Sequence, residues 1–482
     1  MLSSPVRLLL CLGSTLLAIP QVGFAQGDTD LLQLGNARVV NVESGEIELR
    51  DITINDGLIT AIDPPGRQSG SPDRQLDLKG RYLIPGLWDM HVHFEGRELV
   101  EDNALLLPVY LAYGITGVRE AASNLASTVL VWRREVAAGK RLGPHIFTAG
   151  QKFEGIDSLW DGDREIGTLE QMRAGLDEQA ELGVDFIKVT ENTLQPELFL
   201  ATVSEAHRRG FLVSSHIPLG LSVEELAEAG LSSIEHASYL LRLGAPSERT
   251  IAQAVREGRM SAEEATRIYN DGFDQDAANA AYGRLAEAGV AVTPTLIGGR
   301  QLAWLDQTDH SHDPFLRYLT EAFTAKYQWR IDRMAGESSA DSAARKARHQ
   351  LTARQLPALQ AAGVQLLAGS DSAALNTYVY PAEALHKELE LFTDAGLTPL
   401  QALQAATING ARFMRRDSDY GSIAVGKQAD LVVLNDNPLT DIRASRGIFA
   451  VIYHGKIFDR AQLDALLEQA ALRKTALDAE HR

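Results

Sequence analysis

Cysteine is almost absent from this chain: its 482 residues include one, Cys11. Cys11 lies in an apolar N-terminal run, LLLCLGSTLLAIP, which we predict to be removed, so the mature chain would contain no cysteine. Disulfide bonds and thiolate metal ligands are then excluded. Any metal ion that the mature chain binds must be held by nitrogen and oxygen atoms.

Clusters of basic residues are missing as well. The chain has 46 Lys and Arg against 64 Asp and Glu, a net charge of −18, and the acidic residues are spread along its length. Nucleic acids and anionic membrane surfaces both favour clustered Lys and Arg. We therefore expect no nucleic acid and no membrane as a partner of the mature form. Hydrophobic residues make up 45% of the chain, which is enough for a large core.

The N-terminal apolar run is short for a membrane span. Arg7 precedes it, and the small residues Gly23 and Ala25 follow it, before the polar stretch QGDTD. This order is typical of a secretory signal peptide. A membrane anchor is the alternative, but the run is too short to cross a bilayer comfortably. We predict a signal peptide at residues 1–25 and a secreted or periplasmic mature protein.

Strand-like and helix-like segments alternate through the middle of the chain, with amphipathic helical stretches such as 195–209 and 383–395. Eight candidate strands lie at 84–93, 115–119, 145–150, 184–190, 211–216, 232–236, 290–295 and 364–371. Eight β-α repeats predict an α/β fold of the (β/α)8 TIM-barrel type, with a three-layer open sheet as the alternative. The long gap before the last strand predicts a helical insertion at about 297–345, near the mouth of the barrel.

Both ends of the chain are rich in predicted strands. Residues 34–63 alternate apolar and polar side chains around turn signals at Ser44-Gly45 and Asp56-Gly57, which predicts an antiparallel meander. Residues 421–456 also contain strand-like runs. We expect residues 26–84 and 419–470 to form one composite β-sandwich domain, beside a barrel made of residues 85–418.

Potential metal ligands recur where the predicted strands end. In WDMHVHFEG, His91 and His93 project from the same face of the first strand, because side chains at i and i+2 do so. Catalytic residues of a barrel stand at the C-terminal ends of its strands, and neutral imidazole is the commonest metal ligand. The pattern predicts that four histidines and an aspartate converge on a metal site, His91, His93, His216, His236 and Asp371, and the fourth predicted strand carries Lys188.

The order of these residues resembles the amidohydrolase superfamily of metal-dependent hydrolases. The flanking segments LIPGLWDMHVH, DFIKV, IEHASY, LLAGSD, ATINGARFM and GSIAVGKQADLVVL carry the same resemblance, which covers nearly the whole mature chain. Within the superfamily, the chain is most similar to the branch of imidazolonepropionase-like enzymes and metal-dependent prolidases. The resemblance implies that the two β-rich ends form the composite sheet domain of this superfamily.

The resemblance also implies two divalent metal ions, with Zn²⁺ as the first expectation and manganese, iron or cobalt as alternatives. A carbamate formed from CO₂ on Lys188 would bridge the two ions. The alternative for Lys188 is an ordinary surface cation, since mononuclear members of the superfamily lack the carbamate. The remaining ligands would divide between the two ions: His91, His93 and Asp371 on one, His216 and His236 on the other.

Two residues are assigned catalytic roles by the same resemblance. A hydroxide bridging the metals would attack the carbonyl, and Asp371 would pass its proton to the leaving amine. Tyr239 would polarise the carbonyl or bind a substrate carboxylate, with core packing as the alternative. Arg119 and Glu120 end the second predicted strand, where they are expected to support the ligands from behind.

We therefore predict a secreted metal-dependent amidohydrolase that cleaves a C–N amide bond, in a dipeptide of Xaa-Pro type or an N-acyl amino acid. A cyclic amidase that opens a ring, as imidazolonepropionase does, is the first alternative, and a deaminase is another. A catalytically inactive metal-binding scaffold is the alternative from a different class. The expected partner is a small-molecule or dipeptide substrate, and homo-oligomers are compatible with the sequence.

Overall fold

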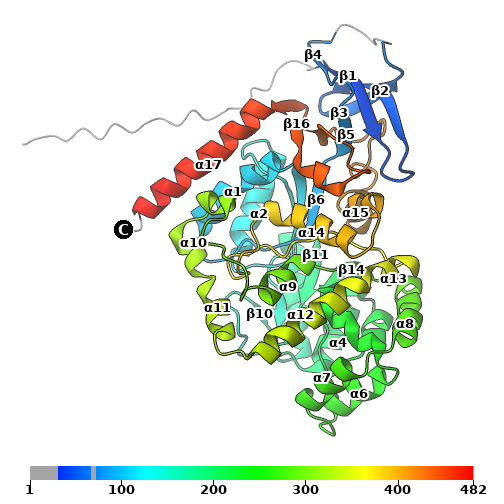
Figure 1. Cartoon of the computed structure of the whole chain (residues 1–482). Helices are drawn as coiled ribbons and strands as arrows, with labels where there is room; N and C mark the ends of the chain where they lie inside the picture. The colour runs from blue at the N-terminus through cyan, green and yellow to red at the C-terminus, as the bar shows by residue number, and fades with distance from the viewer. Residues whose placement is uncertain (1–30, 67–71, 481–482) are drawn as a thin grey trace, which may run out of the picture.

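The computed structural model describes residues 31–66 and 72–480 (Figure 1). The predicted signal peptide, residues 1–25, lies outside these ranges. Within them the chain is a mixed α/β protein in which a sheet from the two chain ends lies beside a larger α/β part. None of the helices in the described ranges has the length and apolar character needed to cross a membrane.

Strands from the two ends of the chain join in one sheet, as predicted, in the order β17-β16-β15-β5-β1-β2-β3 with β4 beside β1. The N-terminal strands are β1 (Leu31–Val40), β2 (Ile47–Asn55), β3 (Leu58–Asp63), β4 (Arg74–Asp77) and β5 (Tyr82–Pro85). The C-terminal strands are β15 (Leu431–Leu434), β16 (Ile448–Tyr453) and β17 (Lys456–Asp459). The antiparallel pairing of β15 with β5 connects the two ends. A division into two packed sheets, as in a sandwich, stays a prediction.

The hairpin between β2 and β3 follows from its two turn residues. Asp56 and Gly57 have φ angles of 50° and 77°. A two-residue hairpin turn with positive φ at both positions matches the twist of the flanking strands, and Asp-Gly is a favoured pair for it. The predicted meander is therefore confirmed at this turn.

The middle of the chain forms parallel strands. One sheet contains β6 (Leu87–Val92), β7 (Ile115–Glu120) and β8 (His145–Thr148). The other contains β9 (Phe153–Glu154), β10 (Arg164–Glu165), β11 (Phe186–Val189), β12 (Leu212–Ser215), β13 (Ser233–Glu235) and β14 (Ala291–Thr293). The first seven predicted strands of the barrel are found among these elements.

The eighth predicted strand, 364–371, is wrong as a regular strand. This segment forms single bridges only, from Leu366 to Val292 and from Ser372 to Val92. The segment ends at Asp371, whose φ of 57° lies outside the extended region. The segment still connects the two parallel sheets, since the Asp371 N–H donates to the His91 carbonyl at 2.7 Å and Leu367 N–H donates to Val292 at 2.9 Å.

A second link joins the sheets on their other side, where the Asp185 N–H donates to the Thr148 carbonyl at 2.9 Å. The arrangement is a TIM-barrel-like α/β fold, in which parallel strands alternate with helices. The helices are α1 (Val100–Ala112), α2 (Ala126–Ala137), α3 (Leu169–Leu182), α4 (Pro196–Arg208), α5 (Val223–Glu228), α6 (Glu248–Arg256), α7 (Ala262–Asp271), α8 (Gln275–Glu287), α13 (Leu356–Ala361), α14 (Glu383–Asp394), α15 (Pro399–Ala405) and α16 (Ile408–Phe413). A closed eight-stranded barrel stays a prediction.

Helix α4 illustrates why these segments are helical. Pro196 occupies the first turn, where a missing N–H costs nothing. Phe199, Val203 and Ala206 are buried at the spacing of one helix face. The predicted helices 195–209 and 383–395 correspond to α4 and α14.

The helical insertion before the last barrel segment lies where it was predicted. It contains α9 (Leu296–Ala303), the short η2 (Pro314–Tyr318), α10 (Glu321–Ala325), α11 (Gln328–Met334) and α12 (Ser339–Arg354). Helices α9 and α12 lie side by side (Figure 1). The long C-terminal helix α17 (Arg460–Glu480), which packs on α1, was not predicted, and the predicted domain end at residue 470 falls inside it.

Candidate functional site

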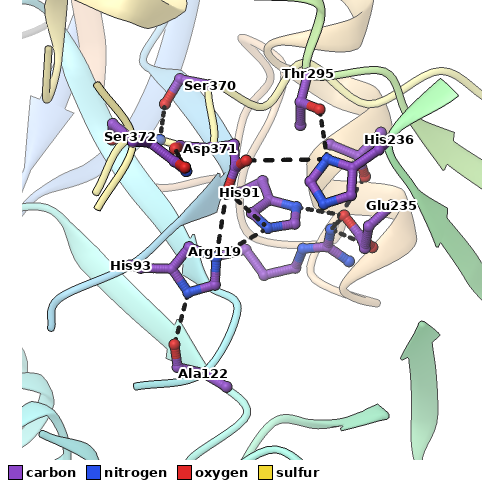
Figure 2. A network of polar contacts seen from close by, with 12 residues as sticks. His91, His93, Arg119, Ala122, Glu235, His236, Thr295, Ser370, Asp371 and Ser372 are labelled. Carbon is purple, nitrogen blue, oxygen red and sulfur yellow. Dashed lines mark hydrogen bonds and ion pairs between the residues drawn. The ribbon is translucent and has the colours of Figure 1, made fainter. Parts of the chain in front are cut away.

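Two pairs of histidines meet at one end of the parallel strands. The Nε2 atoms of His91 and His93 lie 3.2 Å apart, and those of His216 and His236 also lie 3.2 Å apart. Asp371 lies between the pairs: its Oδ1 is 3.4 Å from His91 Nε2 and 3.3 Å from His93 Nε2, and its Oδ2 is 3.9 Å from His236 Nδ1 (Figure 2). Five of the six predicted ligands are therefore brought together by direct contacts.

The strands explain this convergence. His91 lies in β6, and His216 and His236 follow directly after β12 and β13, which are parallel neighbours. The carboxyl ends of parallel strands meet at the same edge of a sheet, so residues at these ends face a common space. Lys188, in β11 beside β12, is the sixth predicted ligand and lines the same cavity as His93, His216 and His236.

Left-handed backbone conformations gather at this edge. His236 and Asp371 have φ angles of 67° and 57°, and Ala122 and Thr295, which contact two of the histidines, have φ angles of 94° and 47°. L-residues rarely adopt this region, and such residues cluster at functional sites, where the surrounding structure holds them in place. The backbone is thus shaped to aim these four residues at the site.

Each histidine is oriented through its other ring nitrogen. Nδ1 lies 2.6 Å from Glu235 in His91 and 2.6 Å from the Ala122 carbonyl in His93. It lies 2.8 Å from Glu191 in His216 and 2.7 Å from the Thr295 hydroxyl in His236. Carboxylate and carbonyl oxygens only accept, so in His91, His93 and His216 Nδ1 carries the proton and donates it. Nε2 then keeps its lone pair, which is the tautomer that a metal ligand needs.

A buried charge network supports His91 (Figure 2). Arg119 donates from Nη2 to Glu235 at 2.7 Å and from Nε to the Met90 carbonyl at 2.6 Å, and both charged side chains are fully buried. Burial alone would raise the pKa of Glu235, but the charge of Arg119 and the hydrogen bond from His91 hold it well below its usual range. Arg119 therefore supports the site from behind, as predicted, whereas Glu120 accepts a hydrogen bond from Thr148.

A different group supports His216. Glu191 accepts hydrogen bonds from His216 Nδ1 and, at 2.6 Å, from the Tyr239 hydroxyl, and the Tyr239 ring stacks on His216 with 5.6 Å between centroids. Burial would raise the pKa of Glu191, but His216 and the two hydrogen bonds lower it to about 2. Tyr239 thus lies beside the predicted ligands, in contact with one of them.

Lys188 is a buried cation without a visible partner. Its side chain is 1% exposed, and in the described part of the chain its Nζ has no hydrogen-bond partner. Burial lowers the pKa of Lys188 to about 8, with Arg119 adding to the effect and Glu235 opposing it. A buried ammonium without hydrogen bonds is costly, so this position favours a modified or neutral amine.

The donor set fits metal ions. Two nitrogen ligands at about 2.0–2.1 Å from a tetrahedral zinc lie about 3.3 Å from each other, close to the separation found in both pairs. Burial lowers the pKa of His91 to about 4 and that of His236 well below its usual range, so these rings are neutral at pH 7. Lone pairs facing each other at such distances repel unless a cation lies between them. Among the described residues, His91, His93 and Asp371 form one group whose ligand atoms lie within 4.8 Å of each other.

Two cavities open at these ligands. One has a volume of about 350 Å³ and extends past Tyr239 toward the insertion helices α11 and α12. The other has a volume of about 390 Å³. It extends past Lys188 toward the segment that follows β6 and toward residues 151–163. His216, His236, Arg330, Asp371 and Asn376 border both. The space suits a small molecule held on both sides of the ligand cluster.

Sequence reasoning missed the residues that orient the ligands. Glu235 and Glu191 are charged residues at the ends of the strand segments SSIE and FIKVTE, which is the local signal that could have found them. Thr295 and the carbonyl of Ala122 carry no such signal, because they act through backbone positions and a common hydroxyl. Arg330 and Arg348, which line the first cavity, lie in amphipathic helices where an arginine is usually at the surface.

Comparisons with known proteins agree with this architecture. The profile of the Amidohydrolase family matches residues 82–458. An adenine deaminase of Methanococcoides burtonii is 25% identical over 417 residues, which are 83% of this chain and 54% of that protein. The chain covers only 24% to 54% of the length of three curated relatives, two named adenine deaminase and one dihydroorotase.

Solved structures share the fold. A bottromycin amidohydrolase has a TM-score of 0.70 at 21% identity, covering 93% of this chain and 91% of its own. A Xaa-Pro dipeptidase with bound methionine in its active site has a TM-score of 0.65 at 21% identity, covering 89% of this chain and 100% of its own. At these identities the likeness establishes the TIM-barrel-like architecture.

Proposed function

The chain belongs to the amidohydrolase family, and from this premise we propose that it is a two-metal hydrolase of C–N amide bonds. Its substrates would be dipeptides of Xaa-Pro type or N-acyl amino acids. One observation carries the proposal: four histidines present Nε2 atoms in two pairs, with Asp371 at the same site and with Lys188, whose Nζ has no hydrogen-bond partner among the described residues. We extend the proposal to a closed eight-stranded barrel with a composite β-sandwich domain.

The ligands divide by their contacts. His91, His93 and Asp371 would hold one ion, and His216 and His236 the other. A carbamate on Lys188 would replace the buried ammonium by a group whose two oxygens share one negative charge, which is a ligand type that suits divalent ions. When bound, the ions, Zn²⁺ first among the candidates, polarise the carbonyl and lower the pKa of water to roughly 7.

Asp371 is suited to move a proton. Burial would raise its pKa, but the neighbouring imidazoles of His91, His93 and His236 hold it well below its usual range, so its carboxylate is ionised at neutral pH. Its Oδ2 lies on the side of the second histidine pair. We propose that this oxygen accepts the proton of the attacking water and passes it to the leaving nitrogen.

Tyr239 is proposed to contact the substrate beside His216. Its hydroxyl donates to Glu191, so it accepts, but does not donate, further hydrogen bonds in this arrangement. It can polarise a substrate carbonyl only if its hydroxyl gives up the hydrogen bond to Glu191 and donates to that carbonyl instead. We therefore assign Tyr239 a contribution to substrate contact and to the position of Glu191.

The test is amine release from Xaa-Pro dipeptides, other dipeptides and N-acyl amino acids by protein reconstituted with zinc and bicarbonate. Turnover that is lost in Lys188→Ala supports the two-metal amidase. A protein with two zinc ions per chain and no turnover on this panel contradicts the substrate class and directs the search to lactams and ring amides. A protein that binds no zinc contradicts the proposal as a whole and supports an inactive scaffold.

Deamination is a second candidate, because the aligned region of an adenine deaminase spans 83% of this chain. Ammonia release from adenine, measured on the same preparation, separates the two reactions. The location also stays a proposal: residues 1–25 support export to the periplasm or the exterior, and protein recovered there without those residues is the expected result.

A further inference from the structure

The two cavities at the ligand cluster differ in charge. We call the first the cationic lobe: three arginines line it, Arg330, Arg345 and Arg348, and its acidic residue is the proposed metal ligand Asp371. We call the second the mixed lobe, because acidic and basic side chains alternate along it. The substrate half that each lobe receives must match this difference.

Three carboxylates of the mixed lobe are paired within the protein. Asp163 pairs with Lys152 at 3.1 Å, and Asp161 pairs with Arg97 at 2.6 Å. Glu98 pairs with Lys326. Glu95 and Asp371 also line this lobe, so it presents acidic groups that the cationic lobe, apart from Asp371, does not.

The cationic lobe is different, because two of its arginines contact neutral groups. Arg345 pairs with Glu337, but no carboxylate lies within 4.0 Å of Arg330 or Arg348 in the part of the chain that is described. Arg330 donates to the Leu375 carbonyl at 2.9 Å and to the Asn376 side chain. These acceptors fix the direction of the guanidinium without neutralising it.

Arg348 is held in the same way from the other side of the lobe. It donates to the Asn270 side chain, and its Nη2 lies 3.4 Å from the Ser238 carbonyl, next to Tyr239. A guanidinium has five N–H donors, so both arginines keep donors free for a ligand. A planar carboxylate is the anion that such donors bind best in a small organic substrate.

We propose that Arg330 and Arg348 bind the free carboxylate of the substrate's leaving amino acid in the cationic lobe. This inference rests on the proposed amidase function and assigns a role to the helical insertion, because Arg330 lies in α11 and Arg348 in α12. The insertion then determines substrate selectivity: amides with a C-terminal carboxylate are accepted, and their carboxamides are not.

The decisive variant is Arg348→Gln, since Arg330 also contacts Asn376, which donates to the Asp371 carbonyl. The matched control is Lys346→Gln, which removes the same charge from the same helix at a residue paired with Asp306 at 2.9 Å. Zinc content and thermal unfolding identify any variant that fails to fold. Arg348→Lys keeps the charge but loses the planar donor pair.

The probes are two matched pairs: L-alanyl-L-proline with its carboxamide, and N-acetyl-L-proline with its carboxamide. Binding to the zinc-loaded protein is measured by calorimetry, and turnover is measured in parallel. We expect the wild type and Lys346→Gln to favour the acids about 10- to 100-fold, the range for a hydrogen bond to a charged group. Arg348→Gln should lose that preference through KM, with carboxamide binding unchanged, and Arg348→Lys should fall between.

The outcomes separate the two claims. Equal binding of acids and carboxamides by the wild type, no binding of either, or a preference that survives in Arg348→Gln overturns the carboxylate site. Arginine-dependent binding of the acids without turnover of any amide keeps the carboxylate site and contradicts the proposed reaction. Equal turnover of acids and carboxamides supports the proposed reaction and contradicts the proposed carboxylate site.

Discussion

The two histidine pairs share one geometry and rest on different supports. Each pair holds its Nε2 atoms 3.2 Å apart. Behind His91 lies the fully buried ion pair of Arg119 and Glu235, and the His91 side chain is 1% exposed. His216 and Glu191 are 24% and 21% exposed, and His216 lines both cavities. The first support is part of the core, and the second is partly exposed beside the cavities. We therefore expect changes behind the first pair to affect folding, and changes behind the second to affect function.

The largest effect is expected from Glu235→Ala. It leaves the guanidinium of Arg119 buried without its carboxylate, and removing one partner of a buried ion pair costs about 3–5 kcal/mol of stability. Chemical denaturation of the metal-free variant measures this loss directly. A loss below about 1 kcal/mol would contradict the view of Glu235 as a folding residue.

The pH dependence of stability should separate the pairs next. Burial lowers the pKa of folded His91 from 6.5 to about 4, so below pH 6.5 the unfolded chain binds a proton that the folded chain excludes. The contribution of His91 to the free energy of unfolding is then lost as the pH falls from 6.5 to 4, by up to about 3 kcal/mol.

Glu191 affects the stability of the fold in a lower pH range. Its pKa is lowered from 4.5 to about 2, so its contribution is present above pH 4.5 and is lost as the pH falls toward 2. Denaturant titrations of metal-free protein at several pH values, with His91→Gln and Glu191→Gln as variants, assign the two windows. Identical pH profiles for both variants would remove the distinction.

Glu191→Ala should keep the fold and weaken metal binding at the second pair. It frees the His216 ring to rotate, and loss of a group that orients a metal ligand costs about 10- to 100-fold in affinity. Competition with a zinc chelator measures this change. A variant with unaltered zinc affinity would show that Glu191 does not orient His216.

The smallest effect is expected from Tyr239→Phe. It removes one of two hydrogen bonds to Glu191 and keeps the ring that stacks on His216. We expect zinc affinity to change by less than about tenfold, the value of one hydrogen bond, while kcat/KM falls more than zinc affinity does. Equal losses in both would assign Tyr239 to metal positioning alone.

The sequence predicts the ligand cluster better than its supports for a physical reason. His91 and His93 are found from the alternation of a strand, and His216 and His236 from the positions where strands end, both of which are local signals. Glu235 meets His91 across 144 positions of sequence, and Thr295 meets His236 across 59, so only the folded chain brings them together. The eighth predicted strand forms single bridges only, and Asp371 at its end has a left-handed backbone conformation that the sequence does not indicate.

Long-range contacts also explain why the sequence alone does not predict the position of α17 or the role of the arginines in the helical insertion. The joined sheet follows from two β-rich ends of the sequence. The packing of α17 on α1 does not follow from the sequence pattern of α17 itself. Arg330 and Arg348 look like surface residues of their helices until the insertion places them over the cavity. In each case, the property depends on what lies opposite the residue.

The most direct test of the two-metal centre is the zinc content of protein reconstituted with zinc and bicarbonate, compared between the wild type and Lys188→Ala. A carbamate on Lys188 that bridges two ions predicts two zinc ions per chain in the wild type and no more than one in the variant. One zinc ion per chain in both proteins would contradict the bridging role of Lys188.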